Sequence, residues 1–475
     1  MSLPRRLLIA AAAAALLLTP GVAIAHPDED HDDAPGEAGS YTERVSTKNL
    51  HALGHSAHPA QFLGVPAAER TVSSDIAFWG DLAIHGNYNG FRVVDVSEPG
   101  APQLVSHPKC NGDQGDIVVW DDLVVRSWNS PAPAGRFCMG EPVPVGFEGV
   151  HLFDISNPAS PQLIGAVEFS EAGAATRGTA DGCGSHTQTV APDLANDRLI
   201  IYSNNSSGSD RPICDTINVL EVPLDEPRNA SHIGYVPLTG GSLGSNNGCH
   251  DAGVILGDVN KLACASGHAT NVFSIGAPGG GSLANPQFLY TVEESDAAGN
   301  KVGVGGRWHS ATFTWDGEVL VLGWEPGGGA APECEASDPA IKKSMFFYDA
   351  DTGAKLGQWT LPRPQTETEN CTIHNYNMVP LRSGRYVAVG GHYQAGTWVV
   401  DFTDPANAKT VAFSDPSPVE PPNLAGAWST YWYDNFIYES EIQSGLNVFR
   451  LADKRVVGAM KLGHLNPQTQ EFSLP

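Results

Sequence analysis

Four histidines stand at matching places in four successive stretches of the chain: His186, His250, His309 and His374. Each lies six residues before the residue at which a β-rich run turns, and these turn residues are Pro192, Leu256, Trp315 and Pro380. If the runs are equivalent strands around one axis, the four imidazoles converge. Because neutral imidazole is a good ligand for copper, iron or zinc, the pattern predicts one transition-metal site. The alternative is structural: repeats inherit residues together, and each histidine then hydrogen-bonds a neighbouring strand.

Further polar residues accompany these histidines. His268 and His392 each lie six residues beyond a matching second-strand position, so we expect both near the same face, where they would orient ligands or flank a substrate. Asp251 adjoins His250, but strand alternation predicts that it points to the other side. Asp75 and Asp116 occupy equivalent inner-strand places, and we favour hydrogen bonding between repeats over metal ligation for them. The sequence assigns no catalytic residue.

A repeated unit must position these side chains. The stretch 90–105, GFRVVDVSEPGAPQLV, returns at 149–164 as GVHLFDISNPASPQLI and at 396–409 as GTWVVDFTDPANAK. Each copy is a glycine-led β-rich run, a turn containing Asp, Ser or Thr, and Pro, and then a second run. Proline near the start of the second run suits an outer strand, where no ladder donor is required.

The same pattern recurs seven times. The third strand of each unit is predicted at Gly90–Val96, Gly149–Ile155, Thr216–Val222, Asn271–Ile275, Ser344–Tyr348, Gly396–Phe402 and Gly445–Leu451. Spacings of roughly 45 to 65 residues, with four short strands each, are typical of propeller blades. We therefore predict an all-β fold with almost no helix: a single β-propeller over 49–475, with blades from about 74, 115, 186, 250, 309, 374 and 428. Seven blades fit best, and six or eight remain alternatives. Asn49–Leu63 is expected to pair with the last repeat as its outer strand.

The units at 81–105, 122–164 and 386–410 resemble LVIVD repeats, which form the blades of a family of secreted bacterial and archaeal β-propellers. The resemblance is close in three blades and only topological in the other four. It implies an extracellular or cell-surface propeller and brings no catalytic motif with it.

Eight cysteines and the absence of any Cys-x-x-Cys pair favour disulfides over thiolate metal sites in an exported chain. In a propeller, the loop before the inner strand and the loop between the second and third strands lie on one face. This geometry predicts four disulfides, each contributing about 3 kcal/mol in the chain-entropy description. The pairs are Cys110–Cys138, Cys183–Cys214, Cys249–Cys264 and Cys334–Cys371.

The N-terminus has the pattern of an export signal. Arg5 and Arg6 precede the apolar run 7–18 and the small-residue site 23–25, so residues 1–25 are predicted to be a Sec signal peptide, or alternatively a twin-arginine one. Residues 26–48 form an acidic, histidine-containing stretch, which we expect to be a flexible tail. No later run is long and apolar enough for a transmembrane helix. The protein is therefore expected to be secreted or held at the cell surface.

The balance of charge limits the partners. Lysine and arginine number 27 against 53 aspartates and glutamates, which gives a formal net charge of −26. Such an acidic surface disfavours nucleic acid and anionic membranes, and no glycine-rich loop has the context of a phosphate cradle, so no nucleotide cofactor is expected. The loops 127–148 and 324–343 are apolar enough to wall a pocket or dock a partner, or alternatively to pack over the rim of the propeller. We expect a monomer.

Two functions remain in view. The first is an extracellular scaffold that binds a ligand or protein on its looped face, with a candidate histidine-ligated metal at the channel mouth. The second is a metal-dependent oxidoreductase that uses the four histidines as ligands. Four axial histidines on a propeller also resemble the iron site of carotenoid-cleavage oxygenases and the metal site of the selenium-binding protein or methanethiol oxidase group. Likeness of fold alone does not carry a function across.

Overall fold

The computed structural model describes residues 32–34, 44–58, 72–112, 114–169, 184–205, 215–243, 248–295, 308–419 and 424–474. Residues Asp32–Pro475 form one compact unit. The predicted signal peptide, most of the predicted tail, Cys183 and Cys214 lie outside the described residues. Within the described residues, helix is limited to 3-10 turns of three or four residues, as predicted. None of the helices in this part of the chain is long and apolar enough to span a membrane.

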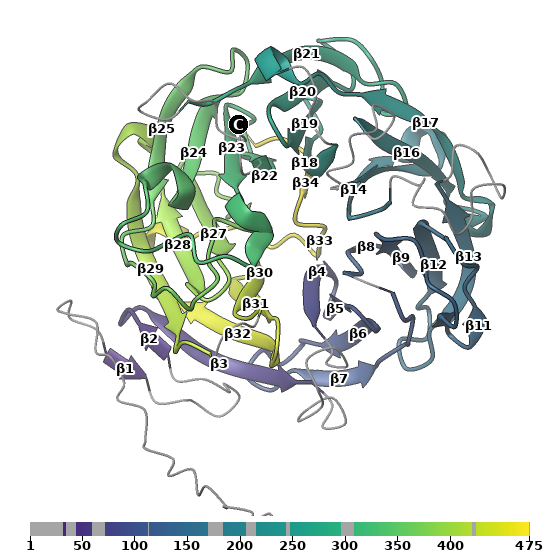
Figure 1. Ribbon diagram of the computed structural model, residues 1–475, viewed down its shortest axis with the longest axis horizontal. Helices are drawn as coiled ribbons and strands as arrows, with labels where there is room; N and C mark the ends of the chain where they lie inside the picture. Colours follow the sequence, from purple (N-terminus) through teal and green to yellow (C-terminus); the bar gives the residue numbers. More distant parts are fainter. Residues whose placement is uncertain are drawn as a thin grey trace, which may run out of the picture. The chain divides into compact units, whose positions relative to one another are not determined.

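The fold is a β-propeller with seven antiparallel, four-stranded blades arranged around a central axis (Figure 1). Blade 1 contains, from the axis outward, β4 (Ser73–Trp79), β5 (Leu82–Asn87), β6 (Gly90–Asp95) and β7 (Gln103–Ser106). Blade 2 contains β8 (Ile117–Trp120), β9 (Leu123–Trp128), β12 (Gly149–Asp154) and β13 (Gln162–Glu168), with the small hairpin β10 (Phe137–Cys138) and β11 (Glu141–Pro142) in its long loop. Blade 3 contains β14 (Thr187–Asp193), β15 (Arg198–Asn204), β16 (Thr216–Pro223) and β17 (Ser231–Pro237).

The remaining four blades follow the same order. Blade 4 contains β18 (Cys249–Ile255), β19 (Lys261–Ser266), β20 (Thr270–Ser274) and β21 (Gln287–Val292). Blade 5 contains β22 (Trp308–Phe313), β23 (Val319–Trp324), β24 (Ser344–Asp349) and β25 (Lys355–Thr360). Blade 6 contains β26 (Tyr376–Met378), β27 (Val387–Gly391), β28 (Thr397–Asp401) and β29 (Lys409–Pro416). Blade 7 contains β30 (Ala427–Tyr433), β31 (Phe436–Glu441), β32 (Gly445–Leu451) and β3 (Leu50–Ala57), so the predicted pairing of the N-terminal strand with the last repeat is confirmed.

Local chemistry explains the repeated strand–turn–strand unit. Gly90 has φ +140°, and a Cβ there would lie 2.0 Å from the carbonyl oxygen of Pro108, so only glycine lets the outer chain approach this closely. Gly149 has the same role in blade 2, with φ +152°. In the turns that follow, the Asp95 carboxylate accepts a hydrogen bond from the Ser97 N–H at 2.9 Å, and Asp154 accepts one from Ser156 at 2.8 Å. These bonds fix the turns that the sequence predicted.

Part of the stretch 26–48, which was predicted to be a flexible tail, pairs with the propeller. β2 (Arg44–Ser46) pairs with the outer strand of blade 6, and β1 (Asp32–Ala34) pairs with β2. The Arg44 guanidinium is buried and forms two hydrogen bonds with the fully buried Glu439 carboxylate, with Nη2–Oε1 at 2.5 Å and Nη1–Oε2 at 3.2 Å. Residues 44–46 thus belong to the propeller.

The C-terminal segment covers one end of the central channel. β33 (His464–Leu465) pairs with β4 and β34 (Thr469–Gln470) pairs with β18, both at the far ends of these inner strands, and Figure 1 shows the two short strands near the axis. The Asn466 amide bonds both the N–H and the carbonyl of Val119, at 2.9 and 2.8 Å. Gln470 donates to Thr312 and to the carbonyl of Phe313 in blade 5. The segment therefore ties together inner strands that are distant in the sequence.

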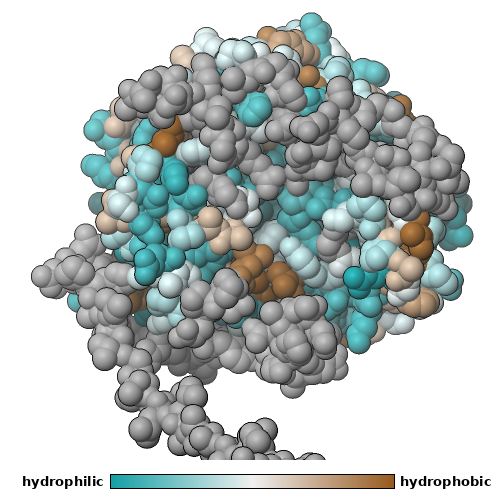
Figure 2. Space-filling model, viewed as in Figure 1, coloured by the Kyte–Doolittle hydropathy of each residue, from teal (hydrophilic) through white to brown (hydrophobic). Residues whose placement is uncertain are grey.

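The exposed surface agrees with the acidic composition. Hydrophilic residues predominate among the coloured residues of the face in Figure 2, and apolar residues gather there only in small groups. Large apolar side chains with more than a third of their surface exposed do occur, among them Phe137, Met139 and Val145. These three lie on the long loop of blade 2.

His58, directly after β3, is a buried histidine whose protonation should affect the stability of the fold. It is 3% exposed, its Nε2 lies 2.9 Å from the Ser73 hydroxyl, and burial lowers its pKa to about 3, assisted by the nearby Arg92. In the unfolded chain this imidazole is protonated below about pH 6.5, whereas in the folded chain it is protonated only below about pH 3. This histidine's contribution to stability therefore falls as pH decreases, by about 1.4 kcal/mol per pH unit.

We expect the free energy of unfolding of the wild type to fall by about 2 kcal/mol more between pH 7 and pH 5 than that of a His58→Gln variant. Urea denaturation at the two pH values measures this difference. His51→Gln, which changes an exposed histidine on the same strand, is the control and should parallel the wild type. Equal pH dependence in the wild type and His58→Gln would contradict the prediction.

Candidate metal centre

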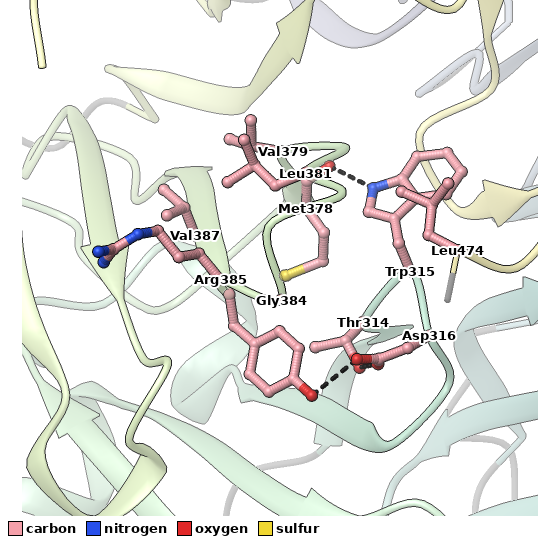
Figure 3. Close-up of a pocket in the computed structure, with 11 residues that line it drawn as sticks. Thr314, Trp315, Asp316, Met378, Val379, Leu381, Gly384, Arg385, Val387 and Leu474 are labelled. Atoms are coloured by element: carbon pink, nitrogen blue, oxygen red, sulfur yellow. Dashed lines mark hydrogen bonds between the residues drawn. The ribbon is translucent and has the colours of Figure 1, made fainter. Parts of the chain in front are cut away.

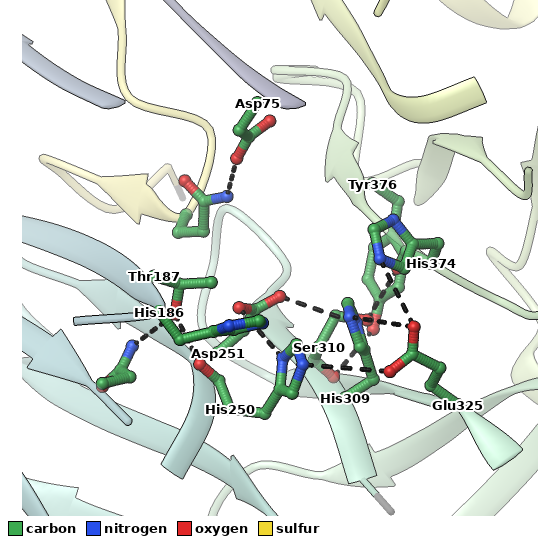
Figure 4. A network of polar contacts seen from close by, with 12 residues as sticks. Asp75, His186, Thr187, His250, Asp251, His309, Ser310, Glu325, His374 and Tyr376 are labelled. Atoms are coloured by element: carbon green, nitrogen blue, oxygen red, sulfur yellow. Dashed lines mark hydrogen bonds and ion pairs between the residues drawn. The ribbon is translucent and has the colours of Figure 1, made fainter. Parts of the chain in front are cut away.

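The four predicted histidines come together at one end of the channel (Figure 4). They lie at or just before the starts of the inner strands of blades 3 to 6, which is the end opposite the C-terminal segment. All are buried, with 8% or less of each residue exposed. The ring centroids are 4.4 Å apart for His186 and His250, 3.9 Å for His250 and His309, and 4.1 Å for His309 and His374. The convergence follows because equivalent places in successive blades face one axis.

A carboxylate faces three of these imidazoles. Glu325, directly after β23, is 2% exposed. Its Oε2 lies 3.8 Å from Nε2 of His250, and its Oε1 lies 3.8 Å from Nε2 of His309 and 3.7 Å from Nε2 of His374. These separations are too long for hydrogen bonds. They are close to the spacing of about 3.3 Å between two ligands of one tetrahedral ion with bonds of 2.0–2.1 Å.

Asp251 corrects the sequence prediction. It was expected to point away from His250, yet its Oδ1 lies 3.4 Å from Nδ1 of His250 and its Oδ2 lies 3.6 Å from Nδ1 of His309. The reason is a β-bulge, since the register between β18 and β19 shifts between Cys249 and Asp251. A bulge interrupts the alternation of side chains and re-aims one of them. Asp251 is therefore in position to orient two imidazoles from the side away from Glu325.

The ligand atoms form two overlapping sets. His250, Asp251 and His309 offer atoms within 4.8 Å of one another, and so do His309, Glu325 and His374. His309 belongs to both sets. A third set among the described residues, Cys110, Cys138 and His151, uses sulfurs already joined in a disulfide, so it offers no thiolate ligand.

Tyr393 completes this side of the centre. Its hydroxyl donates to Glu325 Oε1 at 3.0 Å and lies 2.8 Å from Nε2 of His374. Its backbone has φ +52°, a conformation that a bulky residue rarely adopts and that is concentrated at functional sites. A Cβ on Gly329 would lie 2.3 Å from this hydroxyl, so only glycine lets the loop after Glu325 close over it. Sequence reasoning missed Tyr393 and Glu325.

The hydrogen bonds of His374 fix its tautomer. Its Nδ1 contacts the backbone carbonyl oxygen of Trp428, which can only accept a hydrogen bond. Nδ1 therefore carries the proton, and in the neutral ring Nε2 has a lone pair, so Nε2 and Glu325 Oε1 are alternative acceptors for the single hydroxyl proton of Tyr393. This is the state in which imidazole binds a metal.

His186 and the two second-tier histidines have different positions. Nε2 of His186 lies 3.1 Å from the Gln114 amide nitrogen, and this histidine is in neither ligand set of the described residues. Nδ1 of His392 accepts a hydrogen bond from the His374 N–H at 3.2 Å, and burial lowers the pKa of His392 to about 3. His392 therefore supports the backbone of His374. His268 is half-buried in the turn between β19 and β20, also outside the two sets.

Asp75 and Asp116, which occupy equivalent places in blades 1 and 2, form hydrogen bonds with other parts of the propeller. This agrees with the interpretation favoured from the sequence. Asp116 accepts a hydrogen bond from the Gln188 N–H in blade 3 at 2.6 Å, and Asp75 accepts one from the Gln468 amide of the C-terminal segment at 2.8 Å. Burial raises the pKa of both carboxyl groups, and repulsion from Asp75 and Asp251 raises that of Asp116 further.

The space at the centre is small. The cavity beside the histidines has a volume of about 10 Å³, enough for one water molecule or ion. A second cavity, near the turns of blades 5 and 6, also has a volume of about 10 Å³. Figure 3 shows the residues that line it. There the Trp315 indole donates to the Met378 carbonyl at 2.9 Å, and the Tyr386 hydroxyl donates to Asp316 at 2.7 Å. Neither cavity has room for an organic molecule.

Disulfides tie the surrounding loops in place. The structure forms Cys110–Cys138, Cys249–Cys264 and Cys334–Cys371, as predicted. The fourth predicted pair, Cys183–Cys214, lies outside the described residues. Cys334–Cys371 joins the loop that follows Glu325 to the segment that leads into His374, so it connects two parts of the candidate centre.

Comparison with known proteins identifies the repeat. The LVIVD repeat family matches residues 73–108 and 145–168, which cover blade 1 and the third and fourth strands of blade 2. The first two blades carry LVIVD repeats. These LVIVD repeats are two of the three units that resembled the family in the sequence, and none of the four axial histidines lies within them. The family match therefore establishes the repeat and leaves the chemistry of the later blades open.

Other comparisons add little. No curated protein matches the chain. A similar solved structure is the crystal structure of the computationally designed Ika8 protein, which is 11% identical. The alignment covers 84% of this chain and 99% of that one, with a TM-score of 0.42. This level of likeness carries no functional argument.

Proposed function

We propose that this propeller is an extracellular metal-binding protein that holds one transition-metal ion at the histidine end of its channel. The proposed ligands are His250, His309 and His374, through their Nε2 atoms, with the carboxylate of Glu325, whose Oε1 faces His309 and His374 and whose Oε2 faces His250. The observation that carries the proposal is that three Nε2 atoms from three blades lie 3.7–3.8 Å from one buried carboxylate.

The donor set favours copper, iron or zinc. Imidazole nitrogen suits all three ions, and one carboxylate oxygen is compatible with each. A bound cation would also favour the ionised forms of the buried Glu325 and Asp251 carboxyl groups. Asp251, on the Nδ1 side of His250 and His309, supplies the orientation that carboxylates often give to metal-bound imidazoles.

The chain's own residues define what the site can do. A bound ion would supply Lewis-acid or redox chemistry at the ring of imidazoles. Tyr393 carries a proton at its hydroxyl, between Glu325 and His374, and can hold the carboxylate in one orientation or deliver that proton to a small ligand. The cavity is about the size of one ion, so a further ligand would reach the ion only if the surrounding side chains moved.

Two larger roles are consistent with such a centre. As a scaffold, the protein would bind an extracellular ligand or protein on the disulfide-bearing loops, and the metal would stabilise that face. As an oxidoreductase, it would use the ion for catalysis on a small substrate. We favour the first role. The side chains pack tightly around the proposed position of the ion, which is suitable for holding an ion and leaves no pocket for a substrate.

Metal content tests the proposal directly. We expect protein exported by its own signal and purified without chelator to contain about one transition-metal ion per chain, by inductively coupled plasma mass spectrometry. Metal-free protein should regain one equivalent of copper, iron or zinc on titration. The proposal is wrong if natively exported protein contains essentially none and the metal-free protein binds none of the three.

Replacement of Tyr393 by phenylalanine tests the surroundings of the ligands. We expect the variant to keep its fold and to bind the metal about 10- to 100-fold more weakly, because Glu325 loses the hydroxyl that holds it. Competition with a chromophoric chelator measures the affinity. Tyr386→Phe removes a hydroxyl at the opposite end of blade 6 and is the control, for which unchanged affinity is expected. Equal affinities for Tyr393→Phe and the wild type would contradict the prediction.

A further inference from the structure

A much larger cavity lies on the rim of blade 2, apart from the histidine centre. It has a volume of about 410 Å³ and opens between the long loop of blade 2 and its outer strand, β13. Pro142, Val143, Pro144 and Phe147 form an apolar wall on the loop side. This volume is within the range of sites that bind small organic molecules.

A buried histidine lines this cavity. His151 is 4% exposed, and its ring lies 4.8 Å from Phe147 and 5.7 Å from Trp128 between centroids. Its Nδ1 is inaccessible to solvent and has no hydrogen-bond partner. A buried unpaired N–H is rarer than an unpaired lone pair, so the proton of the neutral ring belongs on Nε2. The neutral ring lines the cavity beside Phe147 and adds to its aromatic surface.

In blade 1 the same place of the repeat holds a different residue with several polar partners. Arg92 occupies the position equivalent to His151 in the repeat. Its guanidinium donates to the hydroxyl of Ser56, at 2.7 Å, and to the carbonyls of Ser56 and Ala57, at 3.0 and 2.9 Å. The shorter histidine of blade 2 makes no such contacts and leaves the volume beside it open.

The charges around the cavity select the ligand. Glu141 and Glu168 are among the lining residues, and the described lining includes no lysine or arginine. The chain as a whole has a formal net charge of −26. An anionic ligand is therefore disfavoured at this site, and a cation is favoured.

We propose that the blade 2 cavity binds a small organic amine with an apolar body. The body would pack against Pro142–Phe147 and the ring of His151, and the ammonium group would lie near Glu168. The inference is independent of the metal centre, since no residue is shared between the two sites.

Matched probes and one blocking substitution test this proposal on the full chain. Tryptamine and indole-3-propionate have the same apolar body and opposite charges. By isothermal titration calorimetry at low salt, we expect tryptamine to bind with a sub-millimolar Kd and indole-3-propionate at least tenfold more weakly. Glu168→Gln should reduce the preference for the amine severalfold.

The blocking variant is Ala166→Trp. Ala166 is the cross-strand partner of His151, so its side chain lies on the same face of the sheet, and its exposure allows a larger residue to be accommodated. We expect Ala166→Trp to abolish tryptamine binding, and Ala159→Trp, an exposed turn position in the same blade, to leave it unchanged. Absence of tryptamine binding at millimolar concentration, equal binding of the acid, or unchanged binding by Ala166→Trp would each overturn the proposal.

Discussion

Replacing His309 with alanine is expected to remove the metal from this propeller. His309 is the one residue, among those described, that belongs to both candidate ligand sets: its Nε2 faces Glu325 and its Nδ1 faces Asp251. Loss of a ligand should weaken binding more than loss of an outer contact, which typically weakens it 10- to 100-fold. We therefore expect metal affinity to fall more than about 100-fold and the content of purified protein to fall from about one ion per chain to near zero.

His186→Gln is the matched control for this experiment. His186 occupies the equivalent place in blade 3, but its Nε2 is engaged by Gln114 and it faces neither carboxylate in the ligand sets. We expect His186→Gln to retain the metal with affinity within a few-fold of the wild type. If it lost the metal as completely as His309→Ala, the four-histidine site predicted from the sequence would be the better description.

Folding must be separated from ligation. His309 is buried, so alanine leaves a small cavity, and His309→Gln keeps most of the side-chain volume without an imidazole. Near-ultraviolet circular dichroism and a thermal melt of the metal-free proteins establish whether both variants are folded. Retention of one ion per chain by a folded His309→Ala variant would contradict the proposed ligand set.

The axial convergence was predictable because repeats supply register. Once the glycine-led third strands are aligned, each residue has a known place along its blade. Four histidines at one place must then face one axis, as the ring distances confirm. The three disulfides formed by described cysteines were predictable for the same reason, since blade position decides which loops share a face.

The rest of the candidate centre depends on departures from the repeat. Asp251 lies beside the imidazoles because a bulge interrupts β18, and no residue in the sequence indicates that bulge. Glu325 and Tyr393 lie just beyond second strands, where loops of different length follow and the register ends. Tyr393 also has a left-handed backbone, which its residue type disfavours. Alignment of repeats gives no information on any of these three features.

The attachment of the N-terminal segment was missed for a different reason. Arg44 and Glu439 are 395 residues apart in the sequence, and neither belongs to a motif. A lone arginine after an acidic stretch is more often solvated than buried. In the structure, this pair joins the strand added to blade 6 to the second strand of blade 7, and it gives the largest stability effect that we expect.

We expect Arg44→Met to lower the free energy of unfolding by about 3–5 kcal/mol. The substitution leaves the Glu439 carboxylate buried without its cation, although Thr397 and Asn447 still donate to it at 2.6 and 2.8 Å. Removing one partner of a buried ion pair is far more destabilising than replacing both, because an uncompensated charge remains in a medium of low polarity. Urea denaturation of the full chain measures the loss.

The double variant Arg44→Met/Glu439→Gln separates charge from packing. Glutamine removes the charge and keeps one oxygen, which can accept the hydrogen bond of Asn447, while its amide nitrogen can donate to the Thr397 hydroxyl, because a hydroxyl can also accept. We therefore expect it to recover a large part of the stability lost in Arg44→Met. Arg450→Met, which changes an exposed arginine on β32, is the control and should alter stability by less than about 0.5 kcal/mol. Equal stabilities for the single and double variants would show that Arg44 acts through its packing on Phe449, 5.3 Å from the ring centroid, and not through the ion pair.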